Sequence, residues 1–291
     1  SKAIVIRRVS SASLAAIIMV PDSALRNDPA LRCRTFPWGE FDRCHGRKVL
    51  EGWAWGGEMD RIGSSYESEQ ILSTTLFAFY RSIGGDASTV QRRQRAARQS
   101  IYLIVRTIGT LAGRNPQDVY LFFTSLRTAE QGIEDFEGYR GGSLHKVLRW
   151  AFERQGLFQS PNAPIPVTTP GDPPPVDVYI DDGRAGEYGF QDVYWECKAI
   201  WNRLSVTADG GAGVHETPVV GQTNFVYVRD RNRGSKAAAN VVVRGYTASN
   251  SIGLVWPGDW TPMQIPEVAV TGGVAPGAGV LVGPFTWTPA S

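Results

Sequence analysis

The sequence predicts a multidomain chain of mixed α and β structure, a helical bundle followed by a β-sandwich. A proline-rich segment, QSPNAPIPVTTPGDPPP, occupies residues 159–175, and because proline lacks an N–H and fixes φ, this segment is a semi-rigid linker. Before it, apolar residues recur at helical spacing, whereas short β-branched and aromatic runs follow it. The 291 residues are also close to the ~250–300 at which one core stops growing. We therefore expect two domains, residues 1–158 and residues 176–291.

Four helices are predicted between residues 64 and 156. Serine or threonine caps three of them, and an Asn-Pro pair starts the third. Gly84-Gly85 ends the first helix and Gly156 ends the fourth. The four start signals are Ser64-x-x-Glu67, Thr89, Asn115-Pro116 and Ser143. The residues predicted to face the core are Leu72, Leu76, Phe79, Tyr80 and Ile83; Ala97, Ile101, Ile104, Val105, Ile108 and Leu111; Val119, Phe122, Phe123 and Leu126; and Leu144, Val147, Leu148, Ala151 and Phe152.

Four strands are predicted after the linker, and Gly, Asn, Asp and Pro clusters separate them. Short strands with such punctuation are typical of a sandwich rather than of a βαβ sheet. The four runs are Val176–Ile180, Asn224–Arg229, Asn240–Tyr246 and Gly279–Thr286.

The charge balance and the motifs exclude several classes of protein. Thirty basic and 28 acidic residues give a net charge of +2, too little for bulk-charge binding, so we expect no nucleic-acid partner. Gln91–Arg98 holds four arginines and is either a polyanion site or, as the net charge favours, a solvated helix face. No apolar run approaches the ~20 residues of a membrane span. G-x-S-x-G, P-loop and dinucleotide-binding motifs are absent.

Metal-ligand patterns for zinc are weak. None of the three histidines starts an HExxH motif. Cys33, Cys44 and His45 are either three zinc ligands or, as we favour, loop residues packed among tryptophans. Cys33 and Cys44 either form a disulfide or are buried thiols like Cys197, because three cysteines are too few for a disulfide framework.

Four carboxylates in the run DVYIDDGRAGEYG form a calcium candidate. Closely spaced carboxylates beside a glycine turn hold calcium in some proteins. Their spacing does not match the alternating ligands of an EF-hand, so a solvated turn after a strand is the favoured alternative. The four residues are Asp177, Asp181, Asp182 and Glu187.

Several segments of the first domain carry a resemblance to a known family. They are Ser13-Leu-Ala-Ala-Ile17, Phe36-Pro-Trp-Gly39, Gly52-Trp-Ala-Trp-Gly-Gly57 and Tyr66–Phe77. Ser10 to Phe158 resembles the C-terminal helical lobe of bacterial gluzincin-type zinc metallopeptidase-like proteins, related to thermolysin and fungalysin.

The resemblance implies a chain that is inactive on its own. In that family an HExxH helix lies upstream, and a carboxylate in a Gly-(Asp/Glu)-Ser-Leu-Ala-Ala-Ile motif is the third zinc ligand. The equivalent position here is Ala12, which cannot bind a metal. The family's oxyanion-stabilising histidine corresponds to the region of Tyr66 and Glu69, but without a metal-activated water no reaction follows. The resemblance therefore implies no cofactor, and zinc only if a segment outside this chain supplies ligands.

The second domain resembles the immunoglobulin-like β-sandwiches of the CARDB family, which is related to cell adhesion. The segments that carry the resemblance are Gly221–Arg229, Asn232-Arg-Gly234, Ala238–Val243 and Gly283–Trp287. A strand, an Asn-x-Gly turn and a returning strand predict a hairpin. Asp230 stands where an apolar residue is expected, and it marks an edge strand or a contact. Because such domains usually continue by another strand, we expect an open sheet edge that pairs with a protein partner or a second copy.

The leading hypothesis is a non-catalytic binding or structural module at a bacterial cell surface or outside the cell, derived from a secreted metallopeptidase-like protein. One alternative is the C-terminal fragment of an active zinc peptidase whose HExxH segment lies outside this chain. The other is an assembly subunit that builds a filament or lattice through the open sheet edge.

Overall fold

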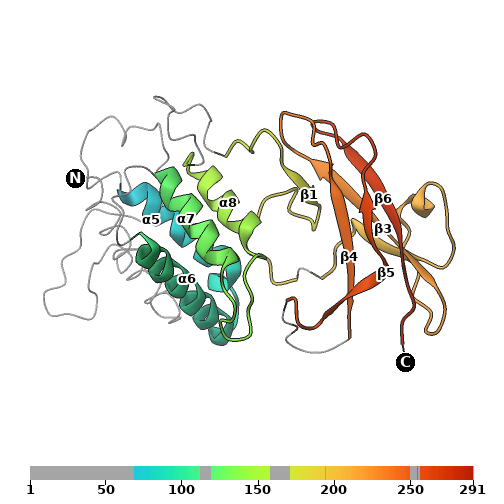
Figure 1. Ribbon diagram of the computed structural model, residues 1–291, viewed down its shortest axis with the longest axis horizontal. Coiled ribbons are helices and arrows are strands. Elements are labelled where there is room, and N and C mark those ends of the chain that lie inside the picture. Colours follow the sequence, from blue (N-terminus) through green and yellow to red (C-terminus); the bar gives the residue numbers. More distant parts are fainter. Residues whose placement is uncertain are drawn as a thin grey trace, which may run out of the picture. The chain divides into compact units, whose positions relative to one another are not determined.

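The computed structural model describes most of the chain from the first predicted helix onward. The described residues are 69–111, 119–157, 171–193, 195–249, 254 and 256–290. The chain divides into two compact units, which we call the helical unit (Ser1–Asp172 with Tyr188–Asp192) and the β unit (Pro173–Glu187 with Val193–Ser291). The division after Asp172 falls within the predicted linker range, but Tyr188–Asp192 joins the helical unit although it follows the linker. The chain is therefore of mixed α and β structure, with helices before antiparallel sheets (Figure 1).

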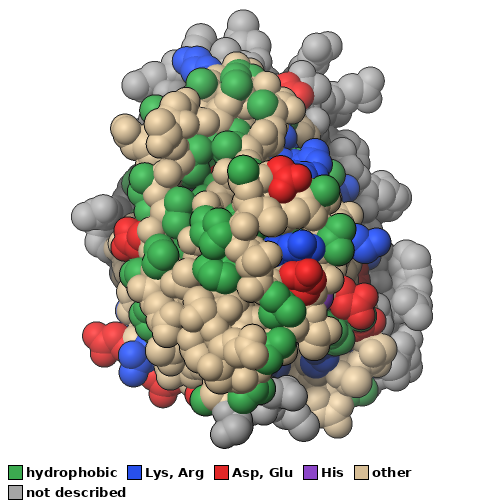
Figure 2. All heavy atoms as spheres, turned by 90° about the vertical axis from the view of Figure 1, so that its right-hand side faces the viewer, with side chains coloured by type: hydrophobic (Ala, Val, Ile, Leu, Met, Phe, Trp, Pro, Cys, Tyr) green, Lys and Arg blue, Asp and Glu red, His purple; other side chains and the backbone are tan. Residues whose placement is uncertain are grey.

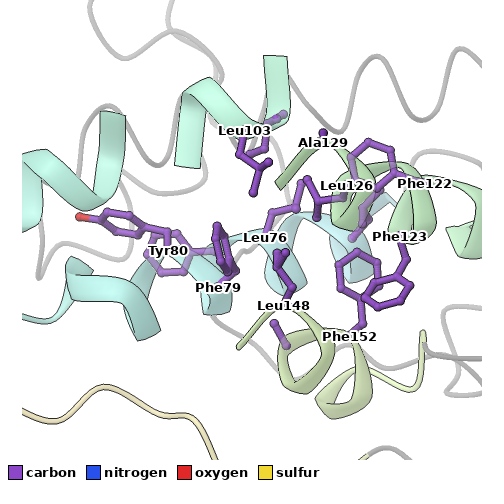
Figure 3. Close-up of a cluster of buried hydrophobic side chains, with 14 of the residues drawn as sticks. Leu76, Phe79, Tyr80, Leu103, Phe122, Phe123, Leu126, Ala129, Leu148 and Phe152 are labelled. Atoms are coloured by element: carbon purple, nitrogen blue, oxygen red, sulfur yellow. The ribbon is translucent and has the colours of Figure 1, made fainter. Parts of the chain in front are cut away.

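Four helices of the helical unit share one apolar core. They are α5 (Glu69–Tyr80), which continues into the π-helical turn η1 (Arg81–Gly85), α6 (Val90–Thr110), α7 (Val119–Gln131) and α8 (His145–Arg154). Figure 3 shows side chains from all four helices pointing toward one another, among them Phe79, Leu103, Phe122 and Phe152. Each of these is fully buried, which contributes roughly 2–3 kcal/mol per side chain. None of the described helices combines the length and apolar character needed to cross a bilayer.

The predicted helix ends are confirmed in part. Gly84 has φ +137°, a conformation that favours glycine, and it lies in the turn that ends the first helix. Thr89 is the N-cap residue of α6, although its side chain makes no capping hydrogen bond. The prediction for Ser143 is wrong, because its hydroxyl donates to Tyr139 Oη (3.2 Å) and α8 begins after Leu144. The start signals Ser64-x-x-Glu67 and Asn115-Pro116 lie outside the described residues.

The predicted core face of α6 is partly wrong. Val105 was expected inside but is 53% exposed, whereas Ser100 and Thr107 are fully buried. The hydroxyl of Thr107 donates to the carbonyl oxygen of Leu103 (2.7 Å), so the polar group is satisfied within its own helix. A polar residue can then face the core, and a pattern of apolar residues alone does not identify this face.

The β unit contains a four-stranded and a two-stranded antiparallel sheet. The strands are β1 (Val178–Ile180), β2 (Ile200–Arg203), β3 (Asn224–Asn232), β4 (Val242–Ala248), β5 (Trp260–Ala269) and β6 (Gly279–Trp287). β3 pairs with β1 and β2 along one edge and with β6 along the other, while β4 pairs with β5. Val228 of β3, Phe285 of β6 and Val243 of β4 belong to one buried cluster, so both sheets share a core.

The predicted hairpin between β3 and β4 is wrong, because these two strands lie in different sheets. The side chain of Asn232 explains the change of sheet. Its Oδ1 accepts from the N–H of Gly234 (3.0 Å), and its Nδ2 donates to the carbonyl oxygens of Lys236 (2.8 Å) and Val274 (3.0 Å). These bonds fix a turn that directs the chain away from β3.

The structure also corrects the interpretation of Asp230 as an edge residue. Asp230 pairs with Ile180 on one side and with Val280 on the other, so it lies in the middle of the sheet. Its side chain is only 2% exposed.

Candidate functional site

The catalytic and zinc-binding candidates fall largely outside the described residues. Ala12, Tyr66 and the group of Cys33, Cys44 and His45 are outside, and Glu69 is described only as the first residue of α5. These assignments remain predictions. Cys197 is a free thiol that donates to the carbonyl oxygen of Asp181 (3.3 Å), and burial raises the pKa of its thiol.

The four calcium candidates do not converge on a shared site in the described part. Asp177, which is 3% exposed, and Glu187 both pair with Arg233. Asp181 Oδ1 accepts from the backbone N–H groups of Gly183 and Ala185 (3.0 Å each).

The remaining candidate, Asp182, pairs with the neighbouring Arg184. Within the described ranges, no three His, Cys, Asp or Glu side chains are grouped so that they could hold a metal ion. Three of the carboxylates therefore serve ion pairs and the fourth serves the turn, while calcium binding remains a prediction.

The arginines of the basic stretch are engaged within the helical unit. Arg92 pairs with Asp192 (3.3 Å) and Arg98 with Glu137 (2.7 Å). Arg93 is buried and donates to the carbonyl oxygens of Ala87 and Ser88, and Arg95 donates to that of Glu137. Arg92, Arg95 and Arg98 are exposed, which supports the favoured solvated helix face, whereas Arg93 is buried and does not belong to such a face.

The helical unit holds a polar group around a buried carboxylate, which we call the Glu130 cluster and which consists of Glu130, Tyr139, Ser143 and His145. Glu130 is 0% exposed. Its Oε1 accepts from Tyr139 Oη and from the N–H groups of Gly142 (2.7 Å) and Leu144 (3.2 Å), while Oε2 has no hydrogen-bond partner among the described residues. The carboxylate thus accepts hydrogen bonds from N–H groups at the start of α8, where the helix dipole favours a negative charge.

The pKa shifts in the Glu130 cluster follow mainly from the burial of Tyr139 and the partial burial of His145. Burial raises the pKa of Tyr139, and its hydrogen bond to Glu130 raises it further. Burial lowers the pKa of His145, and the nearby cation of Arg127 adds to that effect. The hydroxyl of Ser143 is hydrogen-bonded to Tyr139 rather than to His145. Because a serine nucleophile needs a base within hydrogen-bond reach, the geometry fits a structural role better than a catalytic one.

The β unit holds an open cleft of about 440 Å³ beside β3, which we call the β3 cleft. This volume lies within the roughly 300–1,000 Å³ typical of small-ligand sites. Its charged lining residues are Asp181, Asp182, Glu196, Lys198, Arg229 and Arg231. Figure 2 shows one face of the β unit, where acidic and basic side chains lie next to one another.

The alternation of β3 places two arginines in the cleft. Successive side chains point to opposite faces of a sheet, so Val228 and Asp230 face the core while Arg229 and Arg231 are exposed. On the neighbouring β6, a Cβ built on Gly279 would lie 3.3 Å from Cγ of Arg231 and 3.8 Å from Cγ of Arg229. Glycine at position 279 therefore leaves room for the first carbons of both arginine side chains, and both arginines line the same cleft.

Stacked aromatic rings form the floor beside Arg229. Its guanidinium carbon lies 5.7 Å from the centre of the Trp201 ring, a cation–π arrangement. The indole N–H of Trp201 donates to the carbonyl oxygen of Gly210 (2.6 Å), and its ring stacks on Tyr227 at 6.2 Å. The ring beneath Arg229 is thus held in place from two sides.

Most charged side chains of the β3 cleft have no ion-pair partner among the described residues. Among the described residues, Lys198, Arg229 and Arg231 form no ion pair, and neither does Glu196. Asp182 is compensated by Arg184. The cleft therefore presents three cations together with the negative charges of Glu196 and Asp181.

The β3 cleft was not predicted from the sequence. Its residues come from four separate segments, near positions 182, 198, 212 and 230. The one local signal was the spacing of Arg229 and Arg231 at i and i+2, but the predicted strand Asn224–Arg229 ended before Arg231, whereas β3 continues to Asn232 and places both cations on one face. No protein-family model matches the chain, and no curated protein or solved structure is detectably similar to it.

Proposed function

We propose that the protein is a non-catalytic binding module and that the β unit carries the binding surface. The observation that carries this proposal is the β3 cleft, in which Lys198, Arg229 and Arg231 form no ion pair in the described part of the chain. Cations that serve the fold are normally paired, as Arg233 is with Asp177. Exposed cations that line one cleft without an ion-pair partner in the described part instead favour recognition of a ligand.

The family assignments belong to the same proposal. The helical unit is a helical bundle equivalent to the C-terminal lobe of a gluzincin, and the packing of the four described helices around one core supports this. The β unit is an immunoglobulin-like sandwich of the CARDB type, supported by two antiparallel sheets with a common core. A metallopeptidase-derived module with an adhesion-related domain belongs at the bacterial cell surface or outside the cell, where a protein is the expected partner.

The chain offers less support for assembly through a sheet edge. In the described part, β5 pairs only with β4, so its other edge lacks a strand. That strand contains Pro262 and Pro266, each without an N–H to donate. Prolines on an edge strand oppose pairing with another chain.

Hydrolysis of a peptide substrate by the purified 291-residue chain tests the non-catalytic part of the proposal. We expect no hydrolysis of casein in the presence of zinc, and no change when a chelator is added. Chelator-sensitive hydrolysis would overturn the proposal in favour of an active zinc peptidase. Light scattering at increasing protein concentration measures the molar mass and tests the assembly alternative. A monomer at every concentration would contradict that alternative.

A further inference from the structure

We propose that the β3 cleft binds a zwitterionic peptide segment of a partner protein. A carboxylate of the segment contacts Arg229 and Arg231, and a cationic group faces Glu196 and Asp181. This inference rests on the proposed binding function and names the ligand class of that site.

The arginine pair provides the carboxylate site. Both arginines line the cleft, and the stack of Arg229 on Trp201 limits the rotamers that this side chain can adopt. The planar guanidinium group matches a carboxylate through two parallel N–H donors. Because Arg229 is already partly ordered, it loses less conformational entropy when a ligand binds.

The acidic residues of the cleft argue against a polyanion. Asp181 uses Oδ1 for two backbone N–H groups, while its Oδ2 makes no hydrogen bond within the described part. Glu196 is exposed and has no ion-pair partner there. These two carboxylates would repel a uniformly anionic polymer, whereas a ligand that carries both charges is attracted at both ends. The net charge of only +2 agrees with this, because it provides little long-range attraction for polyanions.

The exposure of the cleft favours a peptide over a free amino acid. Lys198, Arg229 and Arg231 are all exposed, so a ligand is covered from one side only. Sites for small free ligands usually bury most of the ligand surface. A peptide segment gains further contacts along the cleft, whose lining includes the small residues Gly183, Ala212 and Gly213, and the remainder of its chain stays in solvent.

Calorimetric titration of the full chain with a capped peptide of alternating glutamate and lysine tests the inference. This probe presents both charges in every register. We expect Arg229→Gln and Arg231→Gln each to weaken binding about tenfold or more, the loss typical of a charged hydrogen-bonding partner. The matched control is Arg244→Gln, because Arg244 is an exposed arginine on β4 that is paired with Glu267. It changes the net charge equally and should leave the affinity unchanged.

Further probes separate the alternative ligands. Capped peptides of glutamate with glutamine and of lysine with glutamine should each bind more weakly than the mixed peptide. An oligogalacturonate that binds more tightly than the mixed peptide would identify the cleft as a polyanion site and overturn the inference. Free glutamate or lysine with equal affinity would overturn the assignment to a peptide.

Equal affinity of the wild type and both cleft variants for the mixed peptide, or no binding by any probe, would also reject the inference. Thermal unfolding of each variant establishes that it is folded. The non-catalytic part of the proposed function fails on a different result, chelator-sensitive hydrolysis, so the two failures are distinguishable.

Discussion

The Glu130 cluster and the β3 cleft both gather charged side chains from several segments, but they use the charge differently. In the Glu130 cluster, a fully buried carboxylate accepts from a tyrosine and from two backbone N–H groups of the same unit. In the β3 cleft, Arg229 and Arg231 are exposed and form no ion pair in the described part. The number of internal partners, rather than the type of residue, thus separates a charge that holds the fold from one available to a ligand.

The same difference between paired and unpaired charge appears in two arginines that are close in sequence, Arg231 and Arg233. Arg233 follows β3, its side chain is 15% exposed, and it pairs with Asp177 and Glu187. Arg231, two positions earlier, faces the cleft. Removing Arg233 would take away an ion-pair partner of the buried Asp177. Arg231 forms no ion pair in the described part, so its removal leaves no buried charge unpaired there. The position of an arginine in the sequence therefore does not show whether it serves the fold or a ligand; its contacts do.

The largest effect is expected from Gly141→Ala, which tests how tightly the Glu130 cluster is built. A Cβ at this position would lie 1.8 Å from the backbone oxygen of Glu130, which cannot move as a flexible side chain does. We expect a loss of about 3 kcal/mol or more in the free energy of unfolding, at the upper end for overpacking. Urea denaturation measures it.

The matched control for this substitution is Gly109→Ala in α6, where a Cβ meets nothing within 4 Å. Alanine there should raise the free energy of unfolding by up to about 1 kcal/mol, the difference in helix propensity. Equal effects of the two substitutions would contradict the tight packing around Glu130.

Glu130→Gln tests the buried charge itself. The amide keeps the shape but removes the negative charge at the start of α8, and its NH2 group cannot accept a hydrogen bond. We expect a loss of roughly 2 kcal/mol, as for hydrogen bonds to charged groups. Glu134→Gln is the control, because Glu134 is exposed on the following loop and should change stability by less than about 0.5 kcal/mol. If both variants unfold at the same urea concentration, the carboxylate does not hold the helix.

The four described helices could be predicted from the sequence because each buries a stripe of its own apolar residues. Strands β2 and β5 could not. β2 has only four residues and buries Asn202, whose side chain bonds Glu216 and Asn224 instead of showing an apolar pattern. β5 contains Pro262 and is exposed on both faces, so it lacks the alternation that marks a half-buried strand.

The site was less predictable than the fold, for a physical reason. The β3 cleft joins the turn at Asp181, the segment at Glu196 and the strand at Arg229, which are close only after folding. Two of the predicted calcium ligands, Asp181 and Asp182, line the cleft. The other two, Asp177 and Glu187, form ion pairs with Arg233. A local cluster of carboxylates in the sequence was therefore divided between two different groups of contacts.

The pH dependence of stability gives a smaller effect in the helical unit. Burial lowers the pKa of His145 below its ordinary value of 6.5. Below about pH 6.5 the unfolded chain therefore binds a proton at this residue more readily than the folded chain does, and stability falls. Above that pH, histidine is neutral in both states and the contribution is fully present.

Comparison of the wild type with His145→Gln checks this prediction. Both proteins are denatured with urea at about pH 8 and at about pH 5.5, on either side of the ordinary histidine pKa. The wild type should lose more stability than the variant as the pH falls, because the variant lacks the titrating group. An equal loss in both would assign the pH dependence to other residues.

The smallest effect on stability is expected for Arg229→Gln and Arg231→Gln, and it is the sharpest test of the comparison between the two regions. Both arginines are exposed and form no ion pair in the described part, so neither substitution leaves a buried charge without its partner. Arg229→Gln loses only the stack on Trp201, which contributes about 0.5–1 kcal/mol at an exposed site. Arg231→Gln should stay within about 0.5 kcal/mol of the wild type. A loss comparable to that of Glu130→Gln would mean that the arginine pair serves the fold, whereas unchanged stability with weakened peptide binding is the pattern of a site kept for a ligand.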